Sequence, residues 1–333
     1  MNRAIYPPAD VAAFPGSDVS QCTDIIDGYL FRDMILSATV ELEARKREID
    51  ELNVFPFPDK DTGANMSATM GAAGVELRDN APPLIGETAE LTAAALLRGA
   101  RGNSGTILVL LFRGFSHAFK GKAAATAAEF ALAMEQGVSA AYKGVMKPQE
   151  GTILTVSRLA AEAALESAKS GDGIKALLKS ALDAARTGLS DTTNQIPALK
   201  KAGVVDAGGL GYTVILEAML RAAHGETSRI MPGAGEFKPE SVFPAVDAGE
   251  TDFNYCAEFI VLFQKSADRQ HLRTFLASAG ISVVIADDAE MMKAHAHTGK
   301  PGELLAELLA FGGLLTFKVE DMRGQQTRYH MET

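Results

Sequence analysis

Apolar residues recur every three or four positions over a long stretch, from Ile26 to Gly225. Leu30, Met34 and Ile35 show the interval at its start, and it is the spacing that an amphipathic α-helix requires. Similar runs, separated by glycine, proline and asparagine clusters, cover roughly 66–78, 87–98, 105–120, 124–143, 152–169, 174–188, 194–201 and 209–223. No alternating strand pattern is found among them. We therefore predict an all-α domain of about eight helices over residues 26–225.

The pattern changes after residue 225. Residues 226–250 are rich in Gly, Pro, Glu and Ser, which predicts an interdomain linker. Beyond it, the sequence predicts strands at Asp252–Phe263, Ile281–Ala286, Met291–His297 and Leu314–Val319, and helices at Ser266–Ala279 and Pro301–Phe311. This β-α-β-β-α-β order is that of a small ferredoxin-like α+β domain, over residues 251–325. Residues 1–25 are interpreted as an N-terminal tail.

The bulk composition restricts the function classes. The formal net charge of the 333 residues is −10, so no nucleic-acid partner is expected, because such partners usually need a basic face. The longest apolar stretches, such as Thr106–Phe112, are far too short for a membrane span, and residues 1–20 lack a signal-peptide pattern. Two cysteines make no disulfide framework, so a cytoplasmic location is expected.

Two carboxylates, Asp59 and Asp61, interrupt the helical pattern in a proline-containing loop. In an α-helix, residues two apart point about 200° from each other, whereas in a loop they can converge. Mg²⁺ prefers one or two such carboxylates together with phosphate oxygens and water. An EF-hand calcium loop is excluded, because its glycine and glutamate positions are here Ala64 and Met70. From this segment alone, a solvated acidic turn remains the alternative.

Two glycine-rich segments each lead into a predicted helix. In the first, Arg101-Gly102-Asn103-Ser104-Gly105, glycines would let backbone amides approach a phosphate at a helix N-terminus. Ser104 could instead be an ordinary N-cap. The second segment, Gly203–Gly211, matches neither the P-loop nor the dinucleotide-binding pattern.

A cysteine and two histidines are expected to meet in the second domain. His295 and His297 are two apart in a predicted strand, so both imidazoles face the same side. The first and third strands of a β-α-β-β-α-β sheet are central neighbours, which brings Cys256 and Glu258 beside them. One thiolate and two imidazoles suit Zn²⁺. A buried cysteine beside two histidines without a metal is the alternative that spacing leaves open.

Four segments in the first domain, "LNVFPFPDKDTGANM", "RGARGNSGTIL", "EGTILTV" and "KAGVVDAGGLGY", resemble the ATP-binding subunit of bacterial fatty acid kinase. The N-terminal domain of that family is similar to the nucleotide-binding subunit of dihydroxyacetone kinase. In the second domain, "FNYCAEF" and "KAHAHTGKPGELL" match the family's middle domain. The resemblance runs in order from about Ile26 to Glu320. It implies a barrel of eight antiparallel helices that binds ATP or ADP through two Mg²⁺ ions, and it favours a structural Zn²⁺ held by Cys256, His295 and His297, with Glu258 or water as fourth ligand.

Carried onto matching positions, the resemblance implies specific roles. Asp59 and Asp61 would hold Mg²⁺, with Asn53 as a weaker candidate ligand, and Arg101 would stabilise the transferring phosphate or else pair with an acidic neighbour. The residues expected to contact the nucleotide, its phosphates or metal-bound water are Thr62, Asn65, Gly102, Asn103, Ser104, Gly105, Asp206 and Gly208.

The function that the resemblance implies is phosphoryl transfer from ATP to the carboxylate of a fatty acid, presented by a separate fatty-acid-binding protein of the DegV type. A homodimer is also compatible with it. Two departures bear on stand-alone activity: Lys60 stands where the family usually has Gly, and the family usually continues into a third domain. The alternatives are a dihydroxyacetone-kinase-like subunit with another acceptor, and a non-catalytic nucleotide-binding scaffold or regulator.

Overall fold

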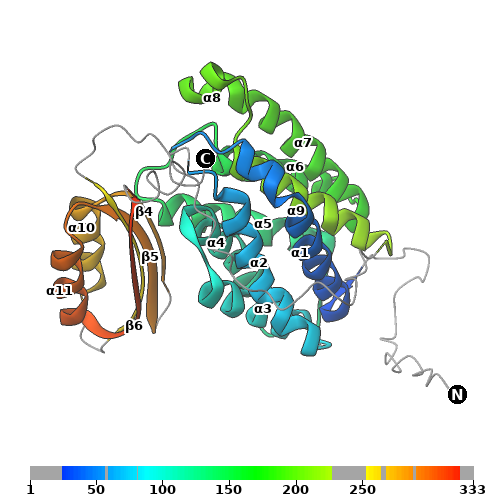
Figure 1. Cartoon of the computed structure of the whole chain (residues 1–333). Helices are drawn as coiled ribbons and strands as arrows, with labels where there is room; N and C mark the ends of the chain where they lie inside the picture. Colours follow the sequence, from blue (N-terminus) through cyan, green and yellow to red (C-terminus); the bar gives the residue numbers. More distant parts are fainter. Residues whose placement is uncertain are drawn as a thin grey trace, which may run out of the picture.

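A computed structural model describes residues 25–56, 59–80, 82–226, 253–263, 268–287 and 290–322. The predicted tail, apart from Ile25, and the predicted linker, apart from Glu226, lie outside these ranges. Among the described residues, the first part of the chain is helical and the second is a four-stranded sheet with two helices (Figure 1). None of the described helices has the length and hydropathy that a membrane crossing needs.

The helical part forms a closed ring. Each long helix packs against the next one in the sequence, and the last packs back on the first. Short connections make successive helices run antiparallel, as expected for a barrel of this kind. The helices of this part are α1 (Gly28–Glu51), α2 (Thr62–Asp79), α3 (Ile85–Gly99), α4 (Gly102–Ala118), α5 (Ala127–Gly144), α6 (Ile153–Lys169), α7 (Ile174–Gln195), α8 (Pro197–Ala202) and α9 (Ala207–Ala223).

Two details differ from the sequence prediction. The run predicted at 194–201 is divided between the end of α7 and the short helix α8, because Pro197 starts a new helix. Two-residue strands β1 (Ile26–Asp27) and β2 (Ala124–Ala125) pair antiparallel, although no strand was predicted in this region. Two residues are too few to show an alternating pattern.

The small sheet has the order β4-β5-β3-β6, and all of its pairings are antiparallel. This confirms the predicted β-α-β-β-α-β arrangement with the first and third strands in the centre. The elements are β3 (Tyr255–Phe263), α10 (Arg269–Ala279), β4 (Ile281–Asp287), β5 (Met291–Thr298), α11 (Pro301–Phe311) and β6 (Gly312–Asp321).

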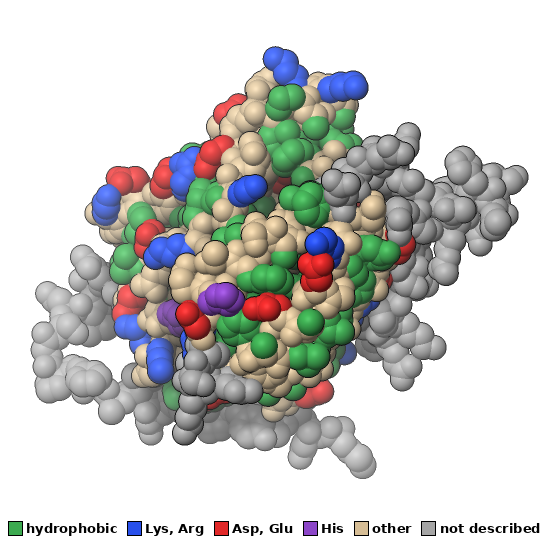
Figure 2. All heavy atoms as spheres, turned by 90° about the vertical axis from the view of Figure 1, so that its left-hand side faces the viewer, with side chains coloured by type: hydrophobic (Ala, Val, Ile, Leu, Met, Phe, Trp, Pro, Cys, Tyr) green, Lys and Arg blue, Asp and Glu red, His purple; other side chains and the backbone are tan. Residues whose placement is uncertain are grey.

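The two faces of this sheet have different neighbours. Ala257, Phe259 and Val261 of β3 and Met292 and Ala294 of β5 point to one face and form a core with α10 and α11. The opposite face carries the alternate residues, and β4 and β5 pack there against α4. The sheet therefore lies between its own helices and the helical part (Figure 1). On the face of the molecule that Figure 2 shows, acidic, basic and apolar side chains are interspersed.

Candidate functional site

The acidic loop before α2 (Thr62–Asp79) brings the Asp59 and Asp61 carboxyl groups together beside Asn65, in the first turn of that helix. Asp61 is the N-cap residue of α2, but its side chain makes no capping hydrogen bond. Asp50, at the end of α1, does the capping instead, because its Oδ1 accepts from the amides of Gly63 (2.7 Å) and Ala64 (3.0 Å). The Asp61 carboxylate is therefore not needed for the cap, and its hydrogen bonds are to the side chains of Asn65 and Asp59. The sequence analysis did not single out Asp50.

Asn53 and Asp59 complete the acidic side of the site. Asn53 is buried, and its Nδ2 donates to Asp59 Oδ1. Burial raises the pKa of Asp59, while burial and the neighbouring Asp59 carboxylate raise the pKa of Asp61 to about 8. Two crowded carboxyl groups of this kind are stabilised in their ionised form by a divalent cation. The pair thus fits the predicted Mg²⁺ role.

Lys60, between the two aspartates, adopts the left-handed backbone conformation with φ 52°. For a residue with a Cβ this costs about 1 kcal/mol, which explains why glycine suits this position. The Lys60 side chain is exposed, so it does not turn inward between the carboxylates. The departure from the family pattern therefore adds local strain without filling the metal position.

The glycine-rich start of α4 lies beside the acidic loop. Gly102 has φ +60°, and a Cβ added to it would come 2.5 Å from Asn65 Nδ2, so a side chain here would need both strain and displacement. The N-cap residue of α4 is Arg101, which gives no side-chain cap. The alternative role of Ser104 as N-cap is therefore wrong, because Ser104 lies inside the first turn. Asn103 Oδ1 is buried without a hydrogen-bond partner in the described structure.

Arg101 itself is exposed and makes no ion pair among the described residues. It lines neither of the two cavities described below, and neither does Gly105. Gly105 instead packs against Thr69, whose Oγ1 would lie 2.2 Å from an added Cβ. The transition-state role of Arg101 stays a prediction.

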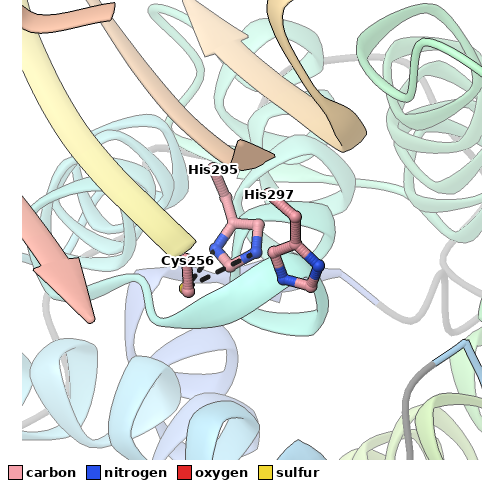
Figure 3. A group of neighbouring side chains, drawn as sticks. All are labelled: Cys256, His295 and His297. Atoms are coloured by element: carbon pink, nitrogen blue, oxygen red, sulfur yellow. Dashed lines mark hydrogen bonds between the residues drawn. The ribbon is translucent and has the colours of Figure 1, made fainter. Parts of the chain in front are cut away.

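The cysteine and the two histidines converge at the edge of the acidic loop. Cys256 lies opposite His297 in the β3–β5 register, and Glu258 lies opposite His295. One ligand atom from each of Cys256, His295 and His297 lies within 4.8 Å of the others, and Figure 3 shows the three side chains gathered together. Cys256 Sγ is 3.9 Å from both ring nitrogens of His295. Burial and the neighbouring His295 lower the pKa of His297 to about 3, so its ring is neutral. Against the effect of burial, Cys256 and Glu258 raise the pKa of His295 to about 10, so this ring holds a proton when no metal is bound. A zinc ligand must be neutral, and zinc binding here would therefore release the proton of His295.

Two charged residues connect the sheet to the start of α4. Glu258 accepts a hydrogen bond from the Gly102 amide, and its Oε1 lies 3.4 Å from His295 Nδ1. Against the effect of burial, the hydrogen bond and charge of His295 lower the pKa of Glu258 to about 2. Lys293 is 5% exposed and donates from Nζ to the Ala100 carbonyl at 2.6 Å. Lys293 was missed in the sequence, although it shares the strand face of His295 and His297 by alternation.

The predicted site residues line two adjoining cavities. A narrow polar cavity of about 90 Å³ is bounded by the acidic loop, the start of α4 and the small sheet. Its lining residues include Asn53, Asp59, Asp61, Thr62, Asn65, Gly102, Asn103, Ser104, Cys256, Glu258, His295 and His297. The expected magnesium and zinc residues therefore face one cavity, rather than two separate regions.

The second cavity is larger, about 350 Å³, and shares Pro56, Thr62, Asn103 and Ser104 with the first. Asp206 and Gly208 lie on its wall. Asp206 also caps α9, since its Oδ2 accepts from the Gly209 amide at 2.7 Å. Burial raises the pKa of Asp206 to about 6. Four residues thus border both the narrow cavity beside the carboxylates and the roomier cavity beside Asp206 and Gly208.

Comparisons with known proteins match both parts of the chain. The profile of the DAK2 domain matches residues 56–221, and that of the middle domain of FakA-like fatty acid kinases matches residues 252–329. An uncharacterised protein of Staphylococcus saprophyticus is 39% identical over 310 residues, covering 90% of this chain and 56% of the relative. Uncharacterised proteins of Staphylococcus epidermidis and Staphylococcus aureus are each 37% identical, with the same coverage. The chain thus spans 56% of the length of these relatives.

Among solved structures, the crystal structure of the dihydroxyacetone kinase from C. freundii in complex with AMP-PNP and Mg²⁺ aligns with a TM-score of 0.46 and 18% identity. The alignment covers 65% of this chain and 38% of that chain. From the two domain matches, which follow one another along the sequence, this chain is a member of the DAK2 family that carries the middle domain of FakA-like fatty acid kinases.

Proposed function

We propose that this protein binds Mg·ATP and transfers the γ-phosphoryl group to the carboxylate of a fatty acid, which a separate DegV-type fatty-acid-binding protein presents. The observation that carries the proposal is the pairing of Asp59 and Asp61 with the start of α4 in one polar cavity. Carboxylates that hold Mg²⁺ and amides that face a phosphate are the main requirements of phosphoryl transfer.

Each group of residues has a role in this proposal. Asp59 and Asp61, with Asn53 beside them, would hold the Mg²⁺ ions, which when bound neutralise phosphate charge. Thr62, Asn65 and the residues 102–104 orient the phosphates, and the larger cavity at Asp206 and Gly208 receives the nucleoside. A fatty acid carboxylate is already a nucleophile. Its oxygen attacks the γ-phosphorus, the bond to the β–γ bridging oxygen breaks, and an acyl phosphate and ADP leave without a general base.

We also propose a Zn²⁺ ion at Cys256, His295 and His297, with Glu258 or water as the fourth ligand. The convergence of one sulfur and two imidazole nitrogens supports it. In this place the ion would tie β3 to β5 at the wall of the polar cavity, which is a structural role.

One observation favours a second candidate, a non-catalytic nucleotide-binding regulator. The Glu258 carboxylate occupies the Gly102 amide, and a phosphate at the same amide would have to displace it. An amide already bonded to an anion is not available for transition-state stabilisation.

The two candidates are separated by product analysis. The protein would be incubated with Mg·ATP and a DegV-type protein loaded with palmitate, and the products would be trapped with hydroxylamine. Formation of ADP and a fatty acyl hydroxamate in equal amounts supports the kinase. Nucleotide binding without any transfer supports the regulator, and transfer to dihydroxyacetone instead would support a dihydroxyacetone-kinase-like protein.

A further inference from the structure

The larger cavity is built from both parts of the chain. One side belongs to the helical part and includes Ile153, Asp206 and Gly208. The opposite side belongs to the small domain and consists of Ala277, at the end of α10, and residues 280–284, at the start of β4. Its volume of about 350 Å³ is within the range of small-molecule sites.

The start of β4 departs from regular strand geometry where it meets this cavity. Ile281 pairs with His297 of β5, but the next partner in the register is Val284 with His295, so Ser282 and Val283 are bulged out of the ladder. Ser282 has φ 53°, a left-handed conformation that non-glycine residues rarely adopt. Bulges and backbone strain of this kind occur preferentially beside functional sites.

Backbone contacts hold this bulge against the helical part. The Met146 amide, just after α5, donates to the Val283 carbonyl at 3.1 Å, and Val145 forms an antiparallel bridge with Val284. Gly144 permits the approach, since a Cβ there would come 2.6 Å from the Ile285 carbonyl oxygen. The wall formed by β4 is therefore fixed in place relative to the helices on the other side of the cavity.

The position of the cavity indicates which part of a ligand it would take. Its shared residues, Thr62, Asn103 and Ser104, also line the polar cavity that contains Asp59 and Asp61. If a triphosphate lies at the carboxylate end, the base and sugar of the same molecule extend toward Ile281 and Val283. The half-buried Ile281 side chain offers an apolar surface for a flat ring, as nucleotide pockets commonly do, whereas the Val283 side chain packs into the core of the small domain.

We propose that the bulged start of β4, Ile281–Val283, forms the nucleobase wall of the site, so that the small domain contributes directly to nucleotide affinity. This inference rests on the proposed Mg·ATP site and adds to it a contact from outside the helical part. It makes the nucleotide a ligand of both domains at once, and its binding then strengthens their association by linkage.

The test is calorimetric titration of the full chain with two ligands, Mg·ATP and Mg·tripolyphosphate. Ile281→Trp would fill the base end of the cavity, while Leu315→Trp places the same side chain at a 55% exposed position on β6 of the same domain. We expect Ile281→Trp to weaken Mg·ATP binding by about tenfold or more, with Mg·tripolyphosphate binding unchanged. Leu315→Trp should alter neither affinity.

A second variant gives an answer even if Ile281→Trp does not fold. Ile281→Ala removes part of the wall without adding bulk, and it should weaken Mg·ATP binding selectively by about threefold. Equal affinity of wild type and both Ile281 variants for Mg·ATP would overturn the inference. An equal loss for both ligands would also overturn it, because it would assign Ile281 to the phosphate end or to general stability. A wild-type protein that binds no Mg·ATP would instead refute the proposed function itself.

Discussion

Asp206→Asn should remove a pH-dependent contribution to stability. Asp206 is buried at the start of α9, and burial raises its pKa from 3.8 to about 6. Because the folded pKa is above the unfolded one, the folded protein binds this proton more tightly. The stability contributed by the protonated carboxyl is fully present below about pH 4 and is lost as the pH rises through about 6.

The size of the effect follows from these two pKa values. Between about pH 5 and about pH 7.5, ionisation of Asp206 should cost the wild-type protein about 1 kcal/mol of unfolding free energy. Asn keeps an oxygen that accepts the hydrogen bond from the Gly209 amide, but it does not ionise. The variant should therefore gain stability relative to wild type as the pH rises over this range.

Urea unfolding of the nucleotide-free protein, followed by circular dichroism at both pH values, measures the difference. Asp191→Asn is the matched control, because it removes a carboxyl of the same kind from an exposed position on α7. It corrects for the change in net charge. If Asp206→Asn and wild type lose stability in parallel between the two pH values, the carboxyl of Asp206 does not titrate in this range and the reasoning is refuted.

Three further outcomes follow from the site. Gly102→Ala and Gly171→Ala both place a Cβ at a residue with positive φ, which costs about 1 kcal/mol each, but of the two only Gly102 has a close neighbour. Thermal unfolding should therefore show a larger loss of stability for Gly102→Ala. Equal losses for the two variants would contradict the close approach of Asn65 to Gly102. Lys293→Met leaves the Ala100 carbonyl without its donor and should cost about 1–3 kcal/mol in urea unfolding, whereas an unchanged midpoint would show that the bond adds nothing. Purified protein should contain about one zinc per chain by metal analysis and Cys256→Ser much less; wild type without zinc would remove that site.

Much of the architecture could be predicted because it depends on local periodicity. The three- and four-residue spacing predicted the long helices, and the alternation in "KAHAH" placed His295 and His297 on one strand face. Strand order then brought Cys256 beside them. Asp59 and Asp61 were identified because the proline-containing loop that carries them interrupts the helical pattern, and the resemblance assigned their role.

The rest depends on how the two parts of the chain meet, which no local pattern encodes. Lys293 was not predicted as a site residue, since its partner is a backbone carbonyl in the other part of the chain. The wall at Ile281–Val283 depends on a bulge and on pairing with Met146. Asp50 caps α2 from α1, across a loop, and side-chain caps at this separation have no sequence signature.

The proposal that Asp59 and Asp61 hold the cations of a bound nucleotide is tested most directly by calorimetric titration of Asp61→Ala with Mg·ATP. Because the Asp61 side chain makes no capping bond, the variant should fold normally, which circular dichroism would verify. We predict that wild type and Asp191→Ala bind Mg·ATP, and that folded Asp61→Ala shows no binding. Folded Asp61→Ala with wild-type affinity would contradict the account.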